Sequence, residues 1–282
     1  MSCPFLREGR AQYCNAAPVR KLILDGPGAT AGGRCTSPAY RECALVADHR
    51  ECGGQCPHLE QIHVQYCGAS PVTPLVPFSE STLSRCAGAG YRYCETYLAL
   101  ARPHKHTEPP PDLLFAPNHL WLSVSEEGLC HIGLDAFIAN VAQRIDRLTF
   151  VTSGGTRRPT VALQVNGVEW PVTFPNPLLI QSTNTHLQIY PQRITEDPYG
   201  SGWLFEGWEV PDRTRAGLIA GARANAWMAE ERQRLSRFVN DSEQVCGDGG
   251  EAAPGIAHLL PRAGVVGLFQ NFFGRTSWSV EE

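Results

Sequence analysis

The chain of 282 residues contains few lysines, few methionines and no long apolar run. Lys21 and Lys105 are its only lysines, so no side-chain amine is available for covalent attachment after residue 105. Polar residues and proline interrupt the longest apolar stretch, 255–274, whereas a membrane span needs about 20 consecutive apolar residues. The first residues, MSCPFLREGR, lack the basic and apolar regions of a secretory signal. We therefore expect a cytoplasmic protein without a membrane span.

Strong net charge and catalytic motifs are also missing. The formal net charge is −4 and 43% of the residues are hydrophobic, which is typical of a soluble globular protein. No basic run suits phosphates, so we expect no nucleic-acid partner. The sequence has no GxSxG elbow, no P-loop and no GxGxxG after a strand. We therefore expect a non-enzyme.

Cysteine is abundant: the chain has 11, and all but Cys130 and Cys246 precede residue 95. The segment CPFLREGRAQYCNAAPV, from Cys3, is repeated as CPHLEQIHVQYCGASPV, from Cys56. Each copy ends alike, in RCTSPAYREC and RCAGAGYRYC, and the cysteine steps are 11, 21 and 8, then 11, 19 and 8. The first hundred residues therefore contain two copies of one unit.

The matched cysteines form two quartets of candidate metal ligands. Disulfides need an oxidising compartment, and an uneven number of cysteines disfavours them. Unrelated buried cysteines would hardly recur in register in both copies. Thiolates are soft ligands that select zinc and iron–sulfur clusters. We therefore interpret these cysteines as metal ligands: Cys3, Cys14, Cys35, Cys43, Cys56, Cys67, Cys86 and Cys94.

The spacing leaves the metal and the pairing open. No quartet contains the Cys-x₂-Cys pairs typical of zinc sites and ferredoxins. Widely spaced ligands predict separate elements of a small α-rich fold around each centre, and we favour two [4Fe–4S] clusters over zinc. A straight helix from Cys3 to Cys14 would separate their thiols by roughly 16 Å. Either the chain turns between them, or the quartets are mixed between the copies.

Other residues near the quartets have weaker assignments. The tyrosines beside the cysteines either shield a cluster or fill two small cores: Tyr13, Tyr40, Tyr66 and Tyr91. Residues without a counterpart in the repeat are not assigned as ligands: Cys52, Cys130, Cys246, His58 and His63.

The remaining sequence predicts four further regions after the cysteine-rich domain of residues 1–102. Prolines mark a linker at 103–112. Alternating apolar residues predict a mostly β domain at 113–210. Helical spacing predicts a helix at 211–245, which starts at Pro211 and Asp212. A Gly-rich joint and an apolar tail occupy 246–282. Exposing Leu268, Phe269, Phe272 and Phe273 would be costly, so the tail either docks to a partner or packs on its own sheet.

Three segments of the β domain resemble the H protein of the glycine cleavage system. They are NHLWLSV from Asn118, CHIGLDAFIANVAQRIDRLTFV from Cys130 and TEDPYGSGW from Thr195. The resemblance implies an α+β chain in which a lipoyl-type flattened barrel of two antiparallel sheets presents a lysine on a tight hairpin. In that family the lysine carries lipoate, and the domain docks to several enzymes. We interpret the DPYG run and the tryptophans as a packing corner and core.

The corresponding hairpin here is VALQVNGVEWPV, with Asn166 and Gly167 at its turn. Asn-Gly is the strongest short hairpin signal, because both central positions of a type I′ turn need positive φ. The lysine is absent, so we expect no lipoate. The sequence thus predicts a metal-binding adaptor subunit of a cytoplasmic redox or metabolic assembly. Its partners would be other protein subunits, bound through the H-like domain and the 254–282 tail. A zinc-stapled structural scaffold and an iron–sulfur electron carrier are the alternatives.

Overall fold

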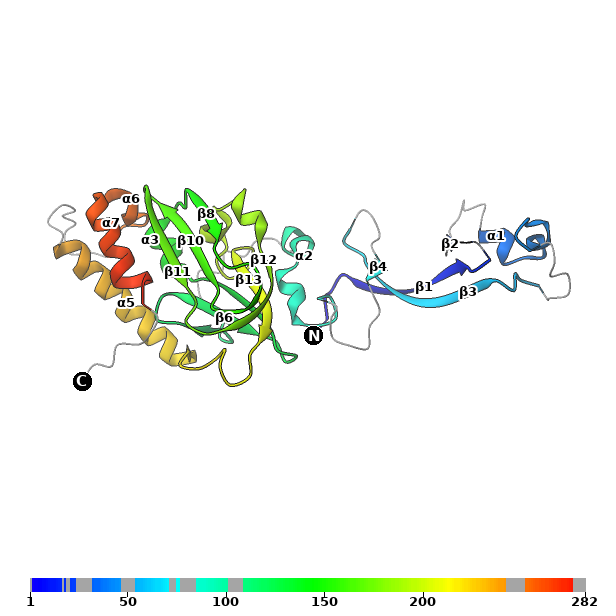
Figure 1. Cartoon of the computed structure of the whole chain (residues 1–282), viewed down its shortest axis with the longest axis horizontal. Coiled ribbons are helices and arrows are strands. Elements are labelled where there is room, and N and C mark those ends of the chain that lie inside the picture. The colour runs from blue at the N-terminus through cyan, green and yellow to red at the C-terminus, as the bar shows by residue number, and fades with distance from the viewer. Residues whose placement is uncertain are drawn as a thin grey trace. The chain divides into compact units, whose positions relative to one another are not determined.

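The computed structural model describes residues 2–16, 18, 21–23, 32–46, 54–70, 75–76, 85–100, 109–241 and 252–275. The chain forms two compact units, Met1–Tyr91 and Arg92–Glu282. Figure 1 labels many of their elements. The division falls before the proline-rich stretch, whose residues 103–108 lie outside the described part. Cys52, Cys246 and Lys105 lie outside it as well. None of the described helices is long and apolar enough to cross a membrane.

The first unit is built on a long antiparallel ribbon of two strands, β1 (Leu6–Cys14) and β3 (Leu59–Cys67). Short strands flank it, β2 (Lys21–Ile23) beside β1 and β4 (Leu75–Val76) beside β3. Among the described residues of this region, helical structure is limited to α1 (Gly32–Cys35), η1 (Pro38–Glu42) and η2 (Ala89–Tyr93). The expectation of an α-rich unit is therefore wrong. Along one edge, each of the two long strands pairs over its whole length with the other copy of the repeat, a partner that no single copy reveals.

The strand register is symmetric with respect to the repeat. Arg10 lies opposite His63, which occupies the same position in the second copy. Leu6 pairs with Cys67, and Cys14 pairs with Leu59, so exchanging the copies reproduces the register. The flanking strands follow the same symmetry: β2 pairs with Gln12–Cys14 and β4 with Gln65–Tyr66, so the pair Tyr13–Leu22 corresponds to the pair Tyr66–Leu75. The two copies are thus related by a pseudo-two-fold axis through the centre of the ribbon.

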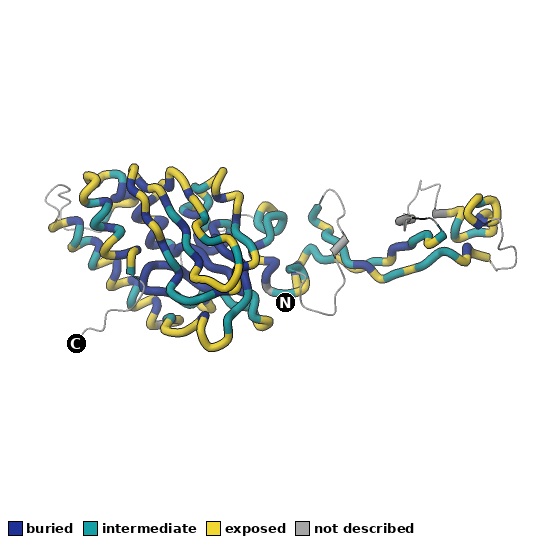
Figure 2. The backbone as a smooth tube through the Cα atoms, in the orientation of Figure 1, coloured by how far each residue is buried: buried dark blue, intermediate teal, exposed yellow. Residues whose placement is uncertain are grey.

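The second unit contains two antiparallel sheets. A three-stranded sheet has the order β11-β10-β8, and a seven-stranded sheet has the order β14-β5-β6-β7-β13-β12-β9. The larger sheet contains β5 (Leu114–Phe115), β6 (Leu120–Val124), β7 (Leu129–Leu134), β9 (Gly155–Arg157), β12 (Leu178–Thr183), β13 (Trp203–Glu209) and β14 (Ile219–Ala220). The smaller contains β8 (Arg147–Phe150), β10 (Thr160–Val165) and β11 (Val168–Thr173). Alternating side chains such as Val161, Leu163 and Val165 fill the core. Figure 2 shows that buried residues run along the strands of this unit.

Short helices join these strands: α2 (Glu95–Leu100), α3 (Ala136–Ala142), η3 (Thr185–Gln188) and α4 (Arg193–Glu196). The unit ends in the long helix α5 (Gly221–Asp241) and the segments α6 (Ile256–Leu259), α7 (Arg262–Leu268) and η4 (Phe269–Phe273). Helix α5 begins at Gly221 and not near Pro211. The residues from Pro211 to Gly217 form turns instead. Thr214 anchors these turns, because its hydroxyl donates to the Pro177 carbonyl at 2.8 Å.

The apolar tail belongs to the core of the second unit. Leu268, Phe272 and Phe273 are fully buried, and Phe269 is partly buried. Figure 1 shows α7 beside α5, next to the edge of the barrel that β11 forms. For residues 252–275 the structure shows the second of the two alternatives that the sequence leaves open: the tail packs on the chain's own domain, which removes these side chains from water. Residues 276–282 lie outside the described part.

Candidate functional site

The hairpin of β10 and β11 has the backbone that its sequence predicts. Asn166 has φ 48° and Gly167 has φ 71°, the pair of positive values that a type I′ turn requires. Val165 and Val168 pair directly before and after the turn. The tip exposes Asn166, Gly167 and Glu169, and none of these residues carries an amine. The tip of this hairpin therefore carries a tight Asn-Gly turn and no side-chain amine.

The tip of this hairpin is fastened to the C-terminal segment. The side-chain amide of Asn166 donates to the carbonyl oxygens of Ala257 at 3.1 Å and Leu260 at 3.4 Å. Both acceptors lie at α6, about ninety residues away in sequence. The turn is thus tied to the domain by a side chain that satisfies backbone acceptors at the end of a short helix.

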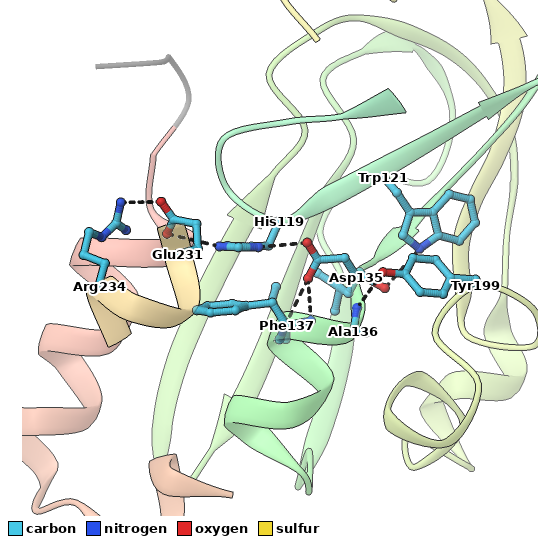
Figure 3. A network of polar contacts seen from close by, with 10 residues as sticks. His119, Trp121, Asp135, Ala136, Phe137, Tyr199, Glu231 and Arg234 are labelled. Carbon is cyan, nitrogen blue, oxygen red and sulfur yellow. Dashed lines mark hydrogen bonds and ion pairs between the residues drawn. The ribbon is translucent and has the colours of Figure 1, made fainter. Parts of the chain in front are cut away.

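A buried histidine links the barrel to α5. His119 precedes β6 and has φ 63°, which is uncommon for a residue with a side chain. Its Nδ1 atom lies 2.8 Å from Oδ2 of Asp135, and its Nε2 atom lies 3.5 Å from Oε2 of Glu231 on α5. The ring stacks between Phe137, at 4.1 Å, and Trp227, at 4.7 Å between centroids. Figure 3 shows His119 held between the two carboxylates.

The surroundings of His119 favour its charged form. Complete burial lowers its pKa, but the charge and hydrogen bond of Asp135, with Glu231, outweigh burial and leave the pKa raised. Asp135 also caps α3 by accepting from the backbone N–H groups of Phe137 and Ile138. The side chain of His119 is wholly inaccessible, so no substrate can reach it. The arrangement is a buried structural link between the barrel, α3 and α5.

The DPYG run forms the packing corner that the sequence predicts. The Pro198 carbonyl accepts from Nε1 of Trp121 at 3.0 Å. The Tyr199 hydroxyl accepts from the backbone N–H of Ala136 at 3.1 Å, as Figure 3 shows. Asp197 accepts from the Ser201 N–H at 2.6 Å. The run thus holds β6 and the start of α3 together.

A second buried pair lies on the larger sheet. Nε2 of His131 is 2.9 Å from Oε2 of Glu206, which also accepts from Ser182 at its other oxygen. Tyr93 stacks on the His131 ring at 3.9 Å, and burial raises the pKa of Tyr93 to about 12. Tyr93 and His131 are packed in the interior, so this pair also serves the core.

A cavity of about 450 Å³ lies between α3 and α5. Apolar side chains form most of its lining, with polar groups from Arg232, Gln233 and Ser236. Its volume is in the range of small-molecule pockets. The segments that follow α5 and precede Pro109 lie outside the described residues, so the cavity itself does not identify an occupant.

The predicted metal ligands lie in the first unit, except Cys94, which belongs to the second. No disulfide joins the cysteines that the structure describes. Within the described residues, no three Cys, His, Asp or Glu side chains stand in a closed arrangement around one point. The described cysteines of the first unit nevertheless gather at the two ends of the ribbon. Cys130, outside the repeat, is buried, and burial raises its pKa to about 12.

One end of the ribbon brings four cysteines close together. Cys35 and Cys43 pack with Cys56 in a small cluster around the fully buried Tyr40. Burial raises the pKa of the Cys35 thiol, and the charges of Cys56, Cys14 and Cys43 raise it further. Tyr40 therefore fills a small core. The sequence predicts these cysteines as ligands, but it does not show which cysteines of the two copies lie together.

Comparisons with known proteins locate the β domain in a family. No protein-family model matches the chain. A glycine cleavage system H protein from Salinibacter ruber is 30% identical over 125 residues, which is 97% of that protein and 42% of this chain. The chain belongs to the glycine cleavage system H protein family.

Two other H proteins match the chain with similar coverage. Those of Marinobacter nauticus and Mycolicibacterium vanbaalenii are 27% and 26% identical, over 99% and 96% of their lengths, each covering 44% of this chain. A crystal structure of an H protein from Mycobacterium marinum matches 43% of this chain and 99% of its own, with 18% identity and a TM-score of 0.38. The H-protein homology thus accounts for less than half of the chain, and the rest is additional to it.

Proposed function

We propose that this protein is a non-catalytic adaptor subunit of a multi-protein redox or metabolic assembly. Its H-protein domain docks to partner subunits without lipoate, and its cysteine repeat binds two metal centres. The observation that carries the proposal is the retained hairpin whose tip offers Asn166 and Gly167 in place of a lysine. A fold kept without its reactive group supports a role in binding.

The hydrogen bonds at the tip support this loss of carrier function. A carrier needs a tip from which a long arm can swing, whereas Asn166 bonds the tip to Ala257 and Leu260. No lysine follows residue 105, so a shift of one or two positions in the hairpin cannot supply the amine. Lipoylation therefore has no acceptor on this domain.

The small core of the first unit supports metal binding. Its buried described residues are few: Cys3, Ala11, Gln12, Tyr40, Val46, Cys56, Val64 and Tyr91. A core of this size contributes little folding free energy, which a structural metal would supplement. Thiolate ligands suit zinc or iron–sulfur clusters, of which we favour [4Fe–4S].

Two measurements test the proposal. The full chain, isolated anaerobically from its host, is expected to elute with partner subunits in fixed stoichiometry and to contain metal by elemental analysis. An optical and EPR spectrum separates a brown cluster protein from a colourless zinc scaffold. A chain that elutes alone and without metal contradicts the proposal.

Co-expression with a lipoate ligase tests the absence of carrier function. A conventional H protein, expressed in parallel, gains the mass of a lipoyl group, and this chain is expected to keep its unmodified mass. A lipoyl adduct on this chain would refute the adaptor proposal.

A further inference from the structure

The first unit provides a rule for pairing its cysteines. The strand β1 extends from Leu6 to Cys14, and a strand rises about 3.3 Å per residue. The two ends of β1 are therefore roughly 26 Å apart. Cys3 precedes one end and Cys14 is the last residue at the other. One metal holds thiolates at about 2.3 Å, so Cys3 and Cys14 cannot bind the same ion or cluster.

Cys56 of the second copy lies at the end of the ribbon where Cys14 lies. The backbone N–H of Cys56 donates to the Cys35 carbonyl at 2.8 Å. The Cys56 carbonyl accepts from Leu59 at 3.1 Å in a tight turn, and Leu59 lies directly opposite Cys14. Cys35 and Cys43 pack in the same cluster as Cys56. Three cysteines of the first copy thus meet one cysteine of the second.

The opposite end of the ribbon repeats this arrangement with the copies exchanged. The N–H of Cys3 donates to the Cys86 carbonyl at 2.8 Å, the counterpart of the bond from Cys56 to Cys35. The Cys3 carbonyl accepts from Leu6 at 3.0 Å, and Leu6 lies opposite Cys67. Two independent hydrogen bonds therefore recur at equivalent positions of the repeat. Cys94 corresponds to Cys43 by the sequence repeat alone.

We infer that the quartets are exchanged between the copies. Cys14, Cys35, Cys43 and Cys56 form one four-thiolate centre, and Cys3, Cys67 and Cys86 supply the thiolates that the first unit contributes to the other. The inference rests on the proposed metal binding and specifies its ligands. Each centre takes a soft metal, either one Zn²⁺ or an iron–sulfur cluster, and its cysteines release their thiol protons on binding.

The geometry of the described end supports this assignment. Cys35 and Cys43 pack with Cys56, and Cys14 lies opposite Leu59 at the same end of the ribbon. A bound cation would stabilise all four thiolates. The described side chains do not enclose a common point, so the proposal requires them to turn toward one centre when the metal binds.

Two double variants of the full chain separate exchanged quartets from quartets within one copy. Both remove Cys14, and each removes one further cysteine. C14S/C56S loses two ligands of the same proposed centre and is expected to keep one of the two metal centres by elemental analysis. C3S/C14S damages both centres and is expected to keep none. The reverse result overturns the inference in favour of quartets within each copy.

Alkylation of the single variant C14S provides a second measurement if the double variants fold poorly. Peptide mass spectrometry is expected to show that Cys35, Cys43 and Cys56 all become accessible to the alkylating reagent. Cys3 is expected to stay protected, as it is in the wild type. Any other pattern of reactivity at Cys3 and Cys56 overturns the pairing. Wild-type protein without metal would instead refute the proposed metal binding itself, so the two failures are distinguishable.

Discussion

Phe273, near the end of the chain, stacks on Trp170 of the hairpin strand β11. Their ring centroids are 4.9 Å apart and the rings are inclined by 30°. Both side chains are fully buried. The C-terminal segment therefore completes the core beside the hairpin of β10 and β11.

Replacing Phe273 by alanine is expected to destabilise the second unit by about 3–5 kcal/mol, the usual loss for a buried phenylalanine. The ring contacts Trp170, Phe137 and His119, so the cavity would open at the centre of this packing. Chemical denaturation followed by tryptophan fluorescence measures the change. Leu259→Ala is the matched control, because Leu259 on α6 is 59% exposed. Equal effects of the two variants would contradict the burial of the tail.

Gly133→Ala is expected to destabilise the barrel through a clash on β7. A Cβ atom at this position would overlap the Trp121 ring. That ring cannot move easily, because its Nε1 donates to the carbonyls of Leu134 and Pro198. Overpacking of a core costs about 1–3 kcal/mol. Gly154→Ala is the control, since a Cβ there meets nothing closer than 4.0 Å; a comparable loss in thermal unfolding in both variants would contradict the prediction.

The raised pKa of His119 predicts a pH-dependent stability. Burial alone would lower that pKa, and Asp135 with Glu231 overcome the effect of burial. The stabilisation is therefore complete below the unfolded histidine pKa of about 6.5. It is lost as pH rises through the higher folded value.

The free energy of unfolding, measured from pH 6 upward, is expected to fall more steeply in the wild type than in His119→Asn. Asparagine tolerates the positive φ at this position but does not titrate. Parallel pH profiles for the two proteins would show that His119 is not the group responsible.

Removing metal is expected to unfold the first unit selectively. Its described core is small, so bound metal would contribute much of its folding free energy. The barrel has its own extensive core and needs no metal. Hydrogen exchange after treatment with a strong chelator is expected to show lost protection in β1 and β3 and unchanged protection in β10 and β13. Unchanged exchange in the ribbon would contradict the prediction.

The sequence predicted the barrel more reliably than the cysteine unit for a physical reason. Alternation, the Asn166–Gly167 turn and the DPYG corner depend on local chemistry that a short window contains. The ribbon of β1 and β3 depends on pairing between the two copies, with Arg10 opposite His63. Its strands carry mixed polar and apolar residues that show no strong period.

The candidate sites also differ in whether local sequence is enough to predict them. The absent lysine could be read directly from the sequence, whereas the buried contact of His119 with Glu231 joins residues far apart in the chain. Asp135 could have been identified as a helix cap before Phe137, but nothing local indicates that it also faces a histidine. The start of α5 was misplaced because the hydrogen bonds of Thr214 and Asn176 hold the preceding turns.

The symmetry of the ribbon has a consequence for how such a unit could arise. A single copy would carry Cys3 at one end of its strand and Cys14 at the other, and would complete neither set of four alone. It could do so only by associating with an identical chain about a true two-fold axis, as in an isologous homodimer. The tandem repeat joins both halves of that dimer in one polypeptide. Within one polypeptide the two copies can also differ in sequence, as they do at the equivalent positions Arg10 and His63, which lie opposite each other.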